Sequence, residues 1–175
     1  MARRKDVKVP ENCTCWHEGD TECRCCGASL VMPVHSLTRG LVGILQACAN
    51  VARDKGGYVI DTDDVELTYS QLCNLQKLRY FGLMVMTVDE HGKHVPRHWT
   101  ITRKGWQFLA GDIRVFKQAR SFRNRIVHWD ETEQDDIPMV SIIDVMRSKA
   151  DPYWQQRSDF VDVAREYANP QERLL

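Results

Sequence analysis

The longest regular pattern in the chain is a run of apolar residues at helical spacing that begins just after Ser36. Its members are Leu37, Leu41, Ile44, Leu45, Cys48, Val51 and Ala52. Residues spaced by three and four positions share one face of a helix, and Ser36 and Thr38 are both residues that cap helix starts. The pattern therefore predicts a helix of about four to five turns that ends at Gly56 and Gly57.

Three shorter elements follow this helix. Residues 58–60 are rich in β-forming side chains and predict a short strand. The acidic residues at 61–64 predict the start of a short second helix that runs to Leu67, because negative charge is favourable at a helix N-terminus. A third helix is expected over residues 70–81, and Gly82 ends it.

The third helix has two different faces. At about 100° per residue, Leu72, Leu75 and Leu78 lie on one side. The opposite side carries Ser70, Cys73, Asn74, Lys77 and Tyr80. Asn can bond adenine and Lys can bond guanine or a phosphate, so this face suits contacts with DNA. The alternative interpretation is an ordinary solvated surface, since every amphipathic helix has a polar outer face.

A hairpin and a fourth helix complete this part of the chain. Residues 83–88 and 95–102 predict two strands around the polar turn 89–94, and a helix is expected from Arg103 to Gly111. Three helices followed by a two-stranded hairpin is the order of a winged helix-turn-helix, whose third helix enters the major groove while the wing contacts the backbone. The sequence therefore predicts an α+β fold with a winged helix-turn-helix core at residues 36–111.

The rest of the chain flanks this core. Residues 1–35 are predicted to form a zinc knuckle with a basic N-terminal arm. Residues 112–175 are expected to form a β-hairpin and helical extension that packs on the core, with an acidic surface that could instead meet a protein partner. No stretch approaches the roughly 18 apolar residues of a membrane span, and no apolar signal segment follows the first residues. We expect a protein of the cytoplasm that has no contact with membranes.

Cysteine is concentrated near the start of the chain. Of the seven cysteines, five lie within residues 13–26, and in a reducing compartment such a cluster favours Zn²⁺. The predicted ligands are Cys13, Cys15, Cys23 and Cys26, with His17 and Cys25 as substitutes. The remaining two, Cys48 and Cys73, lie in helical patterns and are expected to be ordinary core or surface residues.

Charge is balanced in total but uneven along the chain. The 24 basic residues equal the 24 acidic ones, yet residues 93–125 hold nine bases against the single acid Asp112. Binding to phosphates needs a locally positive face, not a positive total. We therefore expect duplex DNA to be read by Ser70, Asn74 and Lys77, and its phosphates to be bound by Lys93, Arg97, Arg103 and Lys104.

Most of the chain resembles a group of small tailed-phage and prophage proteins. The resemblance lies in the order of the cysteine cluster, Leu-Thr-Arg-Gly-Leu at 37–41, Lys-Leu-Arg-Tyr-Phe-Gly-Leu at 77–83, Trp-Thr-Ile-Thr-Arg-Lys-Gly at 99–105 and Phe-Leu-Ala-Gly at 108–111. The pieces at 77–83 and 99–105 are the more specific ones. The resemblance implies a zinc knuckle joined to a winged helix, in a phage protein that regulates transcription or host processes from the host cytoplasm. It supplies no catalytic residue, so a binding protein, and not an enzyme, is expected. The alternative function is a phage inhibitor that binds a host enzyme through protein contacts. The partners considered are duplex DNA, a host protein and a second copy of the chain.

A different motif indicates a nuclease. Residues 123–128 contain Arg-Asn-x-x-x-His, which is similar to the motif of HEPN-type ribonucleases. Arg123 would hold the scissile phosphate and His128 would move a proton. The surroundings lack the long preceding helices of such a bundle. The favoured hypothesis therefore stays a zinc-stabilised winged-helix protein that binds DNA.

Overall fold

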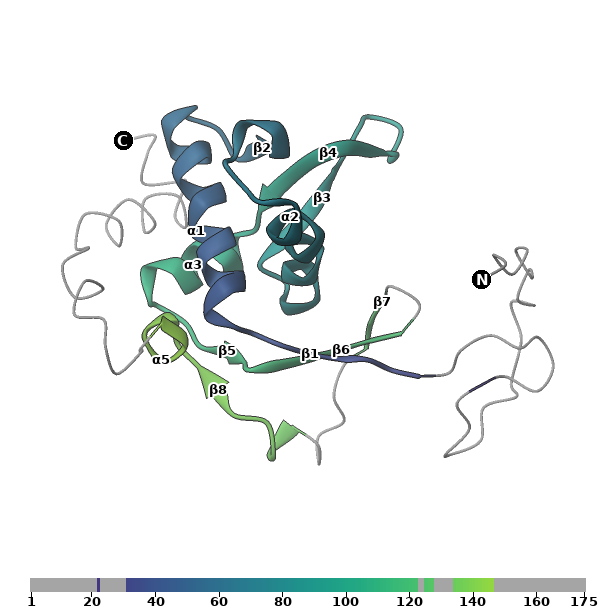
Figure 1. Ribbon diagram of the computed structural model, residues 1–175, viewed down its shortest axis with the longest axis vertical. Coiled ribbons are helices and arrows are strands. Elements are labelled where there is room, and N and C mark those ends of the chain that lie inside the picture. Colours follow the sequence, from purple (N-terminus) through teal and green to yellow (C-terminus); the bar gives the residue numbers. More distant parts are fainter. Residues whose placement is uncertain (1–21, 23–30, 123–124, 128–133, 147–175) are drawn as a thin grey trace.

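The structure is a computed structural model that describes residue 22 and residues 31–122, 125–127 and 134–146. This part of the chain has a mixed α+β fold (Figure 1). Its α-helices are α1 (Arg39–Asp54), α2 (Tyr69–Leu75), α3 (Arg103–Ala110) and α5 (Ile142–Met146), and its 3₁₀ helices are η1 (Thr62–Asp64) and η2 (Gln76–Phe81). None of the described helices is long and apolar enough to cross a membrane.

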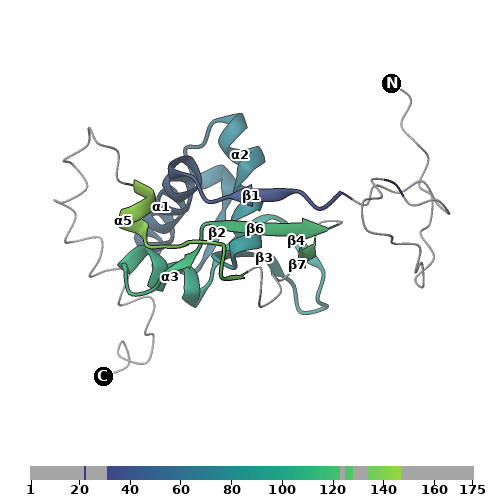
Figure 2. The same ribbon diagram turned by 90° about the horizontal axis from the view of Figure 1, so that it is seen from below.

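Three small antiparallel sheets connect the helices. In the first sheet β4 (His94–Ile101) lies between β2 (Val59–Asp61) and β3 (Met84–Val88), and the β3–β4 hairpin projects away from α1 and α3 (Figure 1). In the second, β6 (Gln118–Phe122) lies between β1 (Val34–Ser36) and β7 (Arg125–Val127), and Figure 2 shows β1 running beside β6. The third pairs β5 (Val115–Phe116) with β8 (Met139–Val140).

Helix α1 forms the centre of the core. Its buried residues include Val42, Leu45 and Cys48, and the Thr38 hydroxyl accepts a hydrogen bond from the Leu41 N–H at 3.4 Å, which caps the helix start. Gly56 follows the helix with a positive φ of 62°. The predicted first helix, its cap and its end are therefore confirmed.

The two helices predicted next differ from expectation. The second is only the 3₁₀ turn η1, and the third is α-helical only to Leu75 before it continues as η2. A 3₁₀ helix turns by about 120° per residue, so side chains three apart are eclipsed. This geometry aligns Leu75, Leu78 and Phe81, which are all buried. Tyr80 was predicted to face outward but is buried, at 8% exposure, because the His35 ring of β1 stacks on it. Leu72, predicted to face inward, is 42% exposed.

One contact network fixes α3 against the hairpin. The Thr102 hydroxyl donates to the Gly82 carbonyl at 2.7 Å and accepts from the Gly105 N–H at 2.9 Å, so it joins the end of η2 to the start of α3. Gly105 lies directly against the Leu83 carbonyl, where a β-carbon would be 2.2 Å from the oxygen. This network gives a physical reason for Thr and Gly in the 99–105 piece.

The described part of the extension shares the core of α1. Val115, Val140, Ile142 and Met146 belong to the same buried cluster as α1. Strand β1, which straddles the boundary predicted at residue 35, pairs with β6 of the extension. The three predicted segments are thus linked by sheet pairing and a common core wherever the structure describes them.

Candidate nucleic-acid interface

A groove lies between α2, the strand β1 and the start of α1. Its volume is about 450 Å³, and Ser70, Asn74 and Lys77 line one wall. The opposite wall carries the polar residues His35, Ser36 and Thr38. The three residues predicted to read bases therefore lie together, on the side of α2 and the start of η2 that faces this groove.

The polar groups of the helix wall differ in how they are held. The Asn74 amide donates to the Ser70 carbonyl at 2.8 Å, which fixes the direction of the Asn74 side chain. Lys77 makes no hydrogen bond or ion pair with any residue that the structure describes. Its ammonium is therefore available for a phosphate or a base acceptor.

His35, in the groove wall opposite Lys77, also contacts residues outside the groove. Its ring stacks on Tyr80 with centroids 4.5 Å apart, and its Nε2 is 2.9 Å from the Ser121 hydroxyl. Partial burial, and secondly the charge of Lys77, lower the pKa of His35 below its ordinary value. A neutral imidazole is thus favoured beside the lysine.

The most exposed face of α2 is different from the predicted one. Tyr69 is 83% exposed, and Leu72, Cys73 and Gln76 are exposed beside it. Sequence reasoning missed Tyr69 and Gln76 as candidate contacts, because it treated residues 70–81 as one α-helix with Leu72 inside. Placing the helix by Leu75 and Leu78 alone would have put Tyr69 and Gln76 outside.

The hairpin carries two of the predicted phosphate contacts. Lys93 is exposed in the turn, where the Asp89 carboxylate accepts from the backbone N–H groups of His91 at 2.9 Å and Lys93 at 2.8 Å. Arg97, at the base of the hairpin, forms an ion pair with Asp63 of η1. Only Lys93 of these two bases therefore points to solvent without an acidic partner in the described part of the chain.

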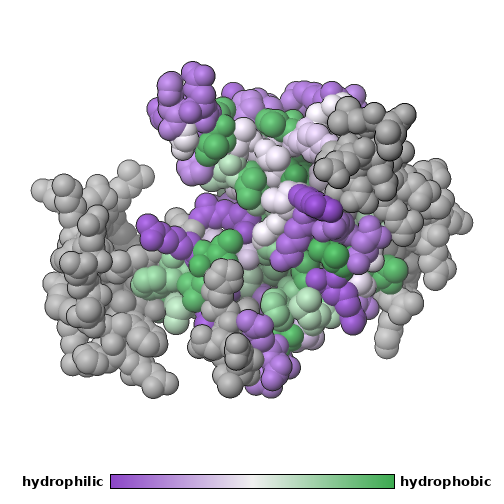
Figure 3. All heavy atoms as spheres, turned by 180° about the vertical axis from the view of Figure 1, so that it is seen from behind, coloured by the Kyte–Doolittle hydropathy of each residue, from purple (hydrophilic) through white to green (hydrophobic). Residues whose placement is uncertain are grey.

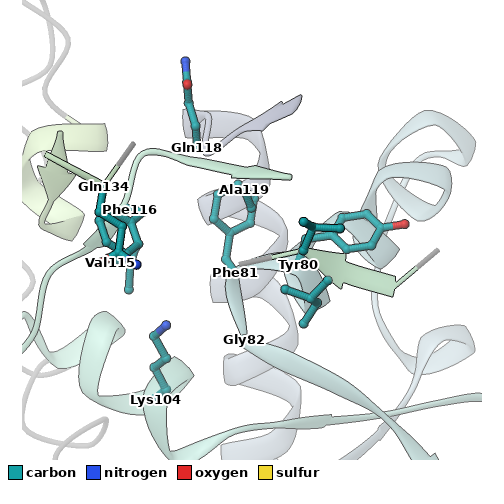
Figure 4. Close-up of a pocket in the computed structure, with 11 residues that line it drawn as sticks. Tyr80, Phe81, Gly82, Lys104, Val115, Phe116, Gln118, Ala119 and Gln134 are labelled. Carbon is teal, nitrogen blue, oxygen red and sulfur yellow. The ribbon is translucent and has the colours of Figure 1, made fainter. Parts of the chain in front are cut away.

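The predicted contacts on α3 lie apart from each other. Arg103 is exposed at the first residue of α3. Lys104 instead extends over Gly82. A β-carbon added to Gly82 would lie 3.6 Å from Lys104 Cδ. Lys104 also lines a second cavity (Figure 4). Partial burial lowers the pKa of Lys104. The seven predicted DNA contacts thus fall into four places: the groove, the hairpin, the exposed first residue of α3 and the second cavity, which Lys104 lines.

The basic stretch predicted from residues 93–125 is partly neutralised by acids from other segments. Besides the Arg97–Asp63 pair, Arg114 lies 3.1 Å from Asp144 of α5.

Figure 3 shows, on the opposite side of the molecule from Figure 1, apolar patches separated by hydrophilic side chains among the described residues. A large continuous apolar patch, typical of a protein-binding surface, is not visible on the described part of that side.

Several predicted residues lie outside the described ones. They are the zinc candidates Cys13, Cys15, Cys23 and Cys26, their substitutes His17 and Cys25, and the nuclease candidates Arg123 and His128. Within the described residues, no group of three or more metal-binding side chains is close enough to hold a metal ion. Cys48 is buried, which raises its pKa to about 12, as expected for an unreactive core thiol, and Cys73 is exposed.

Comparison with known proteins adds no relative. No family model, no curated protein and no solved structure matches this chain.

Proposed function

We propose that this chain binds duplex DNA as a winged helix, with α2 and η2 in the major groove and the β3–β4 hairpin as the wing. The observation that supports the proposal most strongly is the sheet order β2–β4–β3 combined with the chain order α1, β2, α2–η2, β3, β4. In sequence, α2 and η2 lie between strand β2 and the β3–β4 hairpin. In the sheet, β2 pairs with β4, the second strand of the hairpin. A winged helix-turn-helix uses this arrangement to present its third helix and wing together.

The side chains at the front of α2 fit base contacts. Asn74 keeps a carbonyl oxygen and a second amide hydrogen for an adenine edge, since only one N–H is used by Ser70. Lys77 suits guanine or a phosphate, and Ser70 either kind of partner. The exposed residues Tyr69 and Gln76 extend the surface that would meet the groove.

Phosphate contacts would come from either side of this helix. Lys93 and Arg97 lie on the wing, and Arg103 and Lys104 begin α3. Backbone contacts fix the register of a protein on DNA and give salt-dependent affinity. We place this activity in a phage regulator of transcription or host processes, acting in the host cytoplasm, with its N-terminal cysteines bound to zinc and a homodimer as the arrangement for two half-sites.

Fluorescence anisotropy of a labelled duplex, measured over a salt series, tests the proposal. Each phosphate contact is expected to lower log affinity by about 0.9 per log unit of salt. Because Asp63 holds Arg97 in the unchanged chain, the other three proposed contacts, Lys93, Arg103 and Lys104, predict a slope of about −3. Absence of binding to duplex DNA at low salt would refute the function. RNA cleavage that His128→Ala abolishes would support the nuclease instead.

A further inference from the structure

The cavity beside Lys104 is separate from the groove of α2. Its volume is about 210 Å³, and it lies among the end of η2, α3, β5, β6 and β7. Apolar walls come from Phe81, Val115, Phe116 and Val127. Figure 4 shows the Lys104 amine pointing toward the space between Phe81 and Val115, while the Tyr80 hydroxyl points away from that space.

The charge in this cavity has no counter-ion among the described residues. No Asp or Glu is part of its lining, and Lys104 forms no hydrogen bond or ion pair with the residues that the structure describes. Lys104 is exposed to solvent at this cavity, and partial burial of its ammonium lowers its pKa. An anionic group bound in the cavity would pair with this ammonium, and charge-assisted hydrogen bonds are the strong ones.

We infer that this cavity binds a small molecule that has an aromatic body and one carboxylate, with the carboxylate on Lys104 and the ring against Phe81 and Phe116. The apolar walls favour the ring, and a single cation favours a single negative charge. Cavities for drug-sized ligands span about 300–1,000 Å³, so a volume of about 210 Å³ selects a smaller compound.

Such a ligand would also contact the helix that precedes the wing. Phe81 ends η2 and Gly82 follows it, and the Thr102 hydroxyl ties Gly82 to α3, on which Lys104 lies. If the ligand binds the DNA-bound chain with a different affinity from the free chain, the ligand changes the affinity of the chain for DNA by the ratio of those two affinities. This consequence rests on the proposed function, whereas ligand binding itself does not.

Titration calorimetry of the full chain with three compounds tests the site without DNA. Benzoate carries both features, benzyl alcohol only the ring and acetate only the charge. Benzoate is expected to bind roughly tenfold or more tightly than either of the others. Lys104→Met should reduce benzoate affinity to that of benzyl alcohol and leave benzyl alcohol binding unchanged, which also shows that the cavity is intact. Lys104→Arg should keep the preference for benzoate.

Arg103→Met is the matched control, since it removes the neighbouring exposed cation and should leave benzoate binding unchanged. The inference is overturned if benzoate shows no binding up to about 10 mM, a concentration at which even millimolar affinity is detected. It is equally overturned if acetate binds as tightly as benzoate, or if Lys104→Met binds benzoate as the unchanged chain does. None of these results depends on whether the chain binds DNA.

Discussion

Arg97 forms an ion pair with Asp63, which lies 34 residues earlier in the chain at the base of the hairpin. Arg97 has a positive φ of 66°, a conformation that few residues other than Gly, Asn and Asp adopt readily. The Asp63 carboxylate thus neutralises the Arg97 guanidinium on the wing that is proposed to contact DNA. A phosphate must therefore displace Asp63 before Arg97 can contribute to binding.

Removing this carboxylate should strengthen DNA binding. Asp63→Asn frees Arg97, so the affinity for duplex DNA at low salt is expected to rise several-fold and the salt slope to steepen by about 0.9, the value of one phosphate contact. Anisotropy titrations measure both. The gain should vanish in the double variant Asp63→Asn/Arg97→Asn, because Asn tolerates the left-handed backbone but carries no charge.

Asp64→Asn is the control for the loss of negative charge alone. Asp64 is the adjacent acid, and it pairs with Lys55 instead of Arg97. If the two single variants gain equally, or if the double variant keeps the gain, then Arg97 is not a phosphate contact.

The contact of Gly105 with Leu83 predicts a large effect on stability. A β-carbon at Gly105 would be 2.2 Å from the Leu83 oxygen, and neither backbone can move without disturbing α3 or the hairpin. Gly105→Ala is expected to lower the free energy of unfolding by about 1–3 kcal/mol, as overpacked core substitutions do. Urea denaturation followed by circular dichroism measures it.

Gly43→Ala is expected to increase stability, in contrast to Gly105→Ala, when it is measured by the same urea denaturation. Gly43 lies within α1 and a β-carbon there would meet nothing within 4 Å. The gain in helix propensity should raise the free energy of unfolding by about 0.5–1 kcal/mol. Equal stability of the Gly105→Ala variant and the unchanged chain would contradict the described joint between α3 and the hairpin.

Much of the local structure could be predicted from sequence, because it depends on near neighbours. The face of α1, the end of η2 at Gly82 and the α3 stop at Gly111 all follow from periodicity and glycine position. The burial of Tyr80 could not be predicted, since the ring that covers it, His35, lies 45 positions earlier in the chain on β1. The switch from α to 3₁₀ geometry at Gln76 also leaves no periodic signal over so few residues.

Contacts between distant segments were also beyond the sequence pattern. The pairing of β1 with β6 joins residues 34–36 to 118–120, and the Arg97–Asp63 pair joins strand β4 to the 3₁₀ turn η1. The candidate site was consequently predicted only in part. Ser70, Asn74 and Lys77 do share one wall, whereas Lys104 lines a different cavity.

The neutral state of His35 predicts a pH dependence of stability. Its pKa is lowered in the folded chain from 6.5, so below pH 6.5 the unfolded state binds more protons than the folded state. The free energy of unfolding should therefore fall as pH decreases from about 7 toward 5, because protonation pulls the equilibrium toward the unfolded chain. Urea denaturation at a series of pH values measures this slope.

His35→Gln should flatten that slope. His91→Gln is the control, because His91 is exposed in the hairpin turn and its replacement should leave the slope unchanged. A slope that persists unaltered in His35→Gln would show that another group causes it.

The predicted zinc site can be tested by composition. We expect the purified chain to contain one zinc ion per molecule, and the variant Cys23→Ser/Cys26→Ser to contain none, because it would remove two of the four predicted thiolate ligands. Atomic emission analysis after dialysis measures the metal. The control variant Cys48→Ala/Cys73→Ala should retain its zinc. If the unchanged chain contains no zinc after purification, the prediction is wrong.

The central claim is that the groove wall formed by α2 and by Lys77 of η2 meets DNA, and one comparison of affinities tests it most directly. Lys77→Gln and Arg114→Gln each remove one positive charge, but Lys77 lies in the groove wall and Arg114 is paired with Asp144 at α5. In anisotropy titrations with one duplex at fixed low salt, Lys77→Gln is expected to weaken binding by about tenfold, corresponding to roughly 1.4 kcal/mol, and Arg114→Gln to leave it within about twofold. Equal affinity of the two variants would contradict the account.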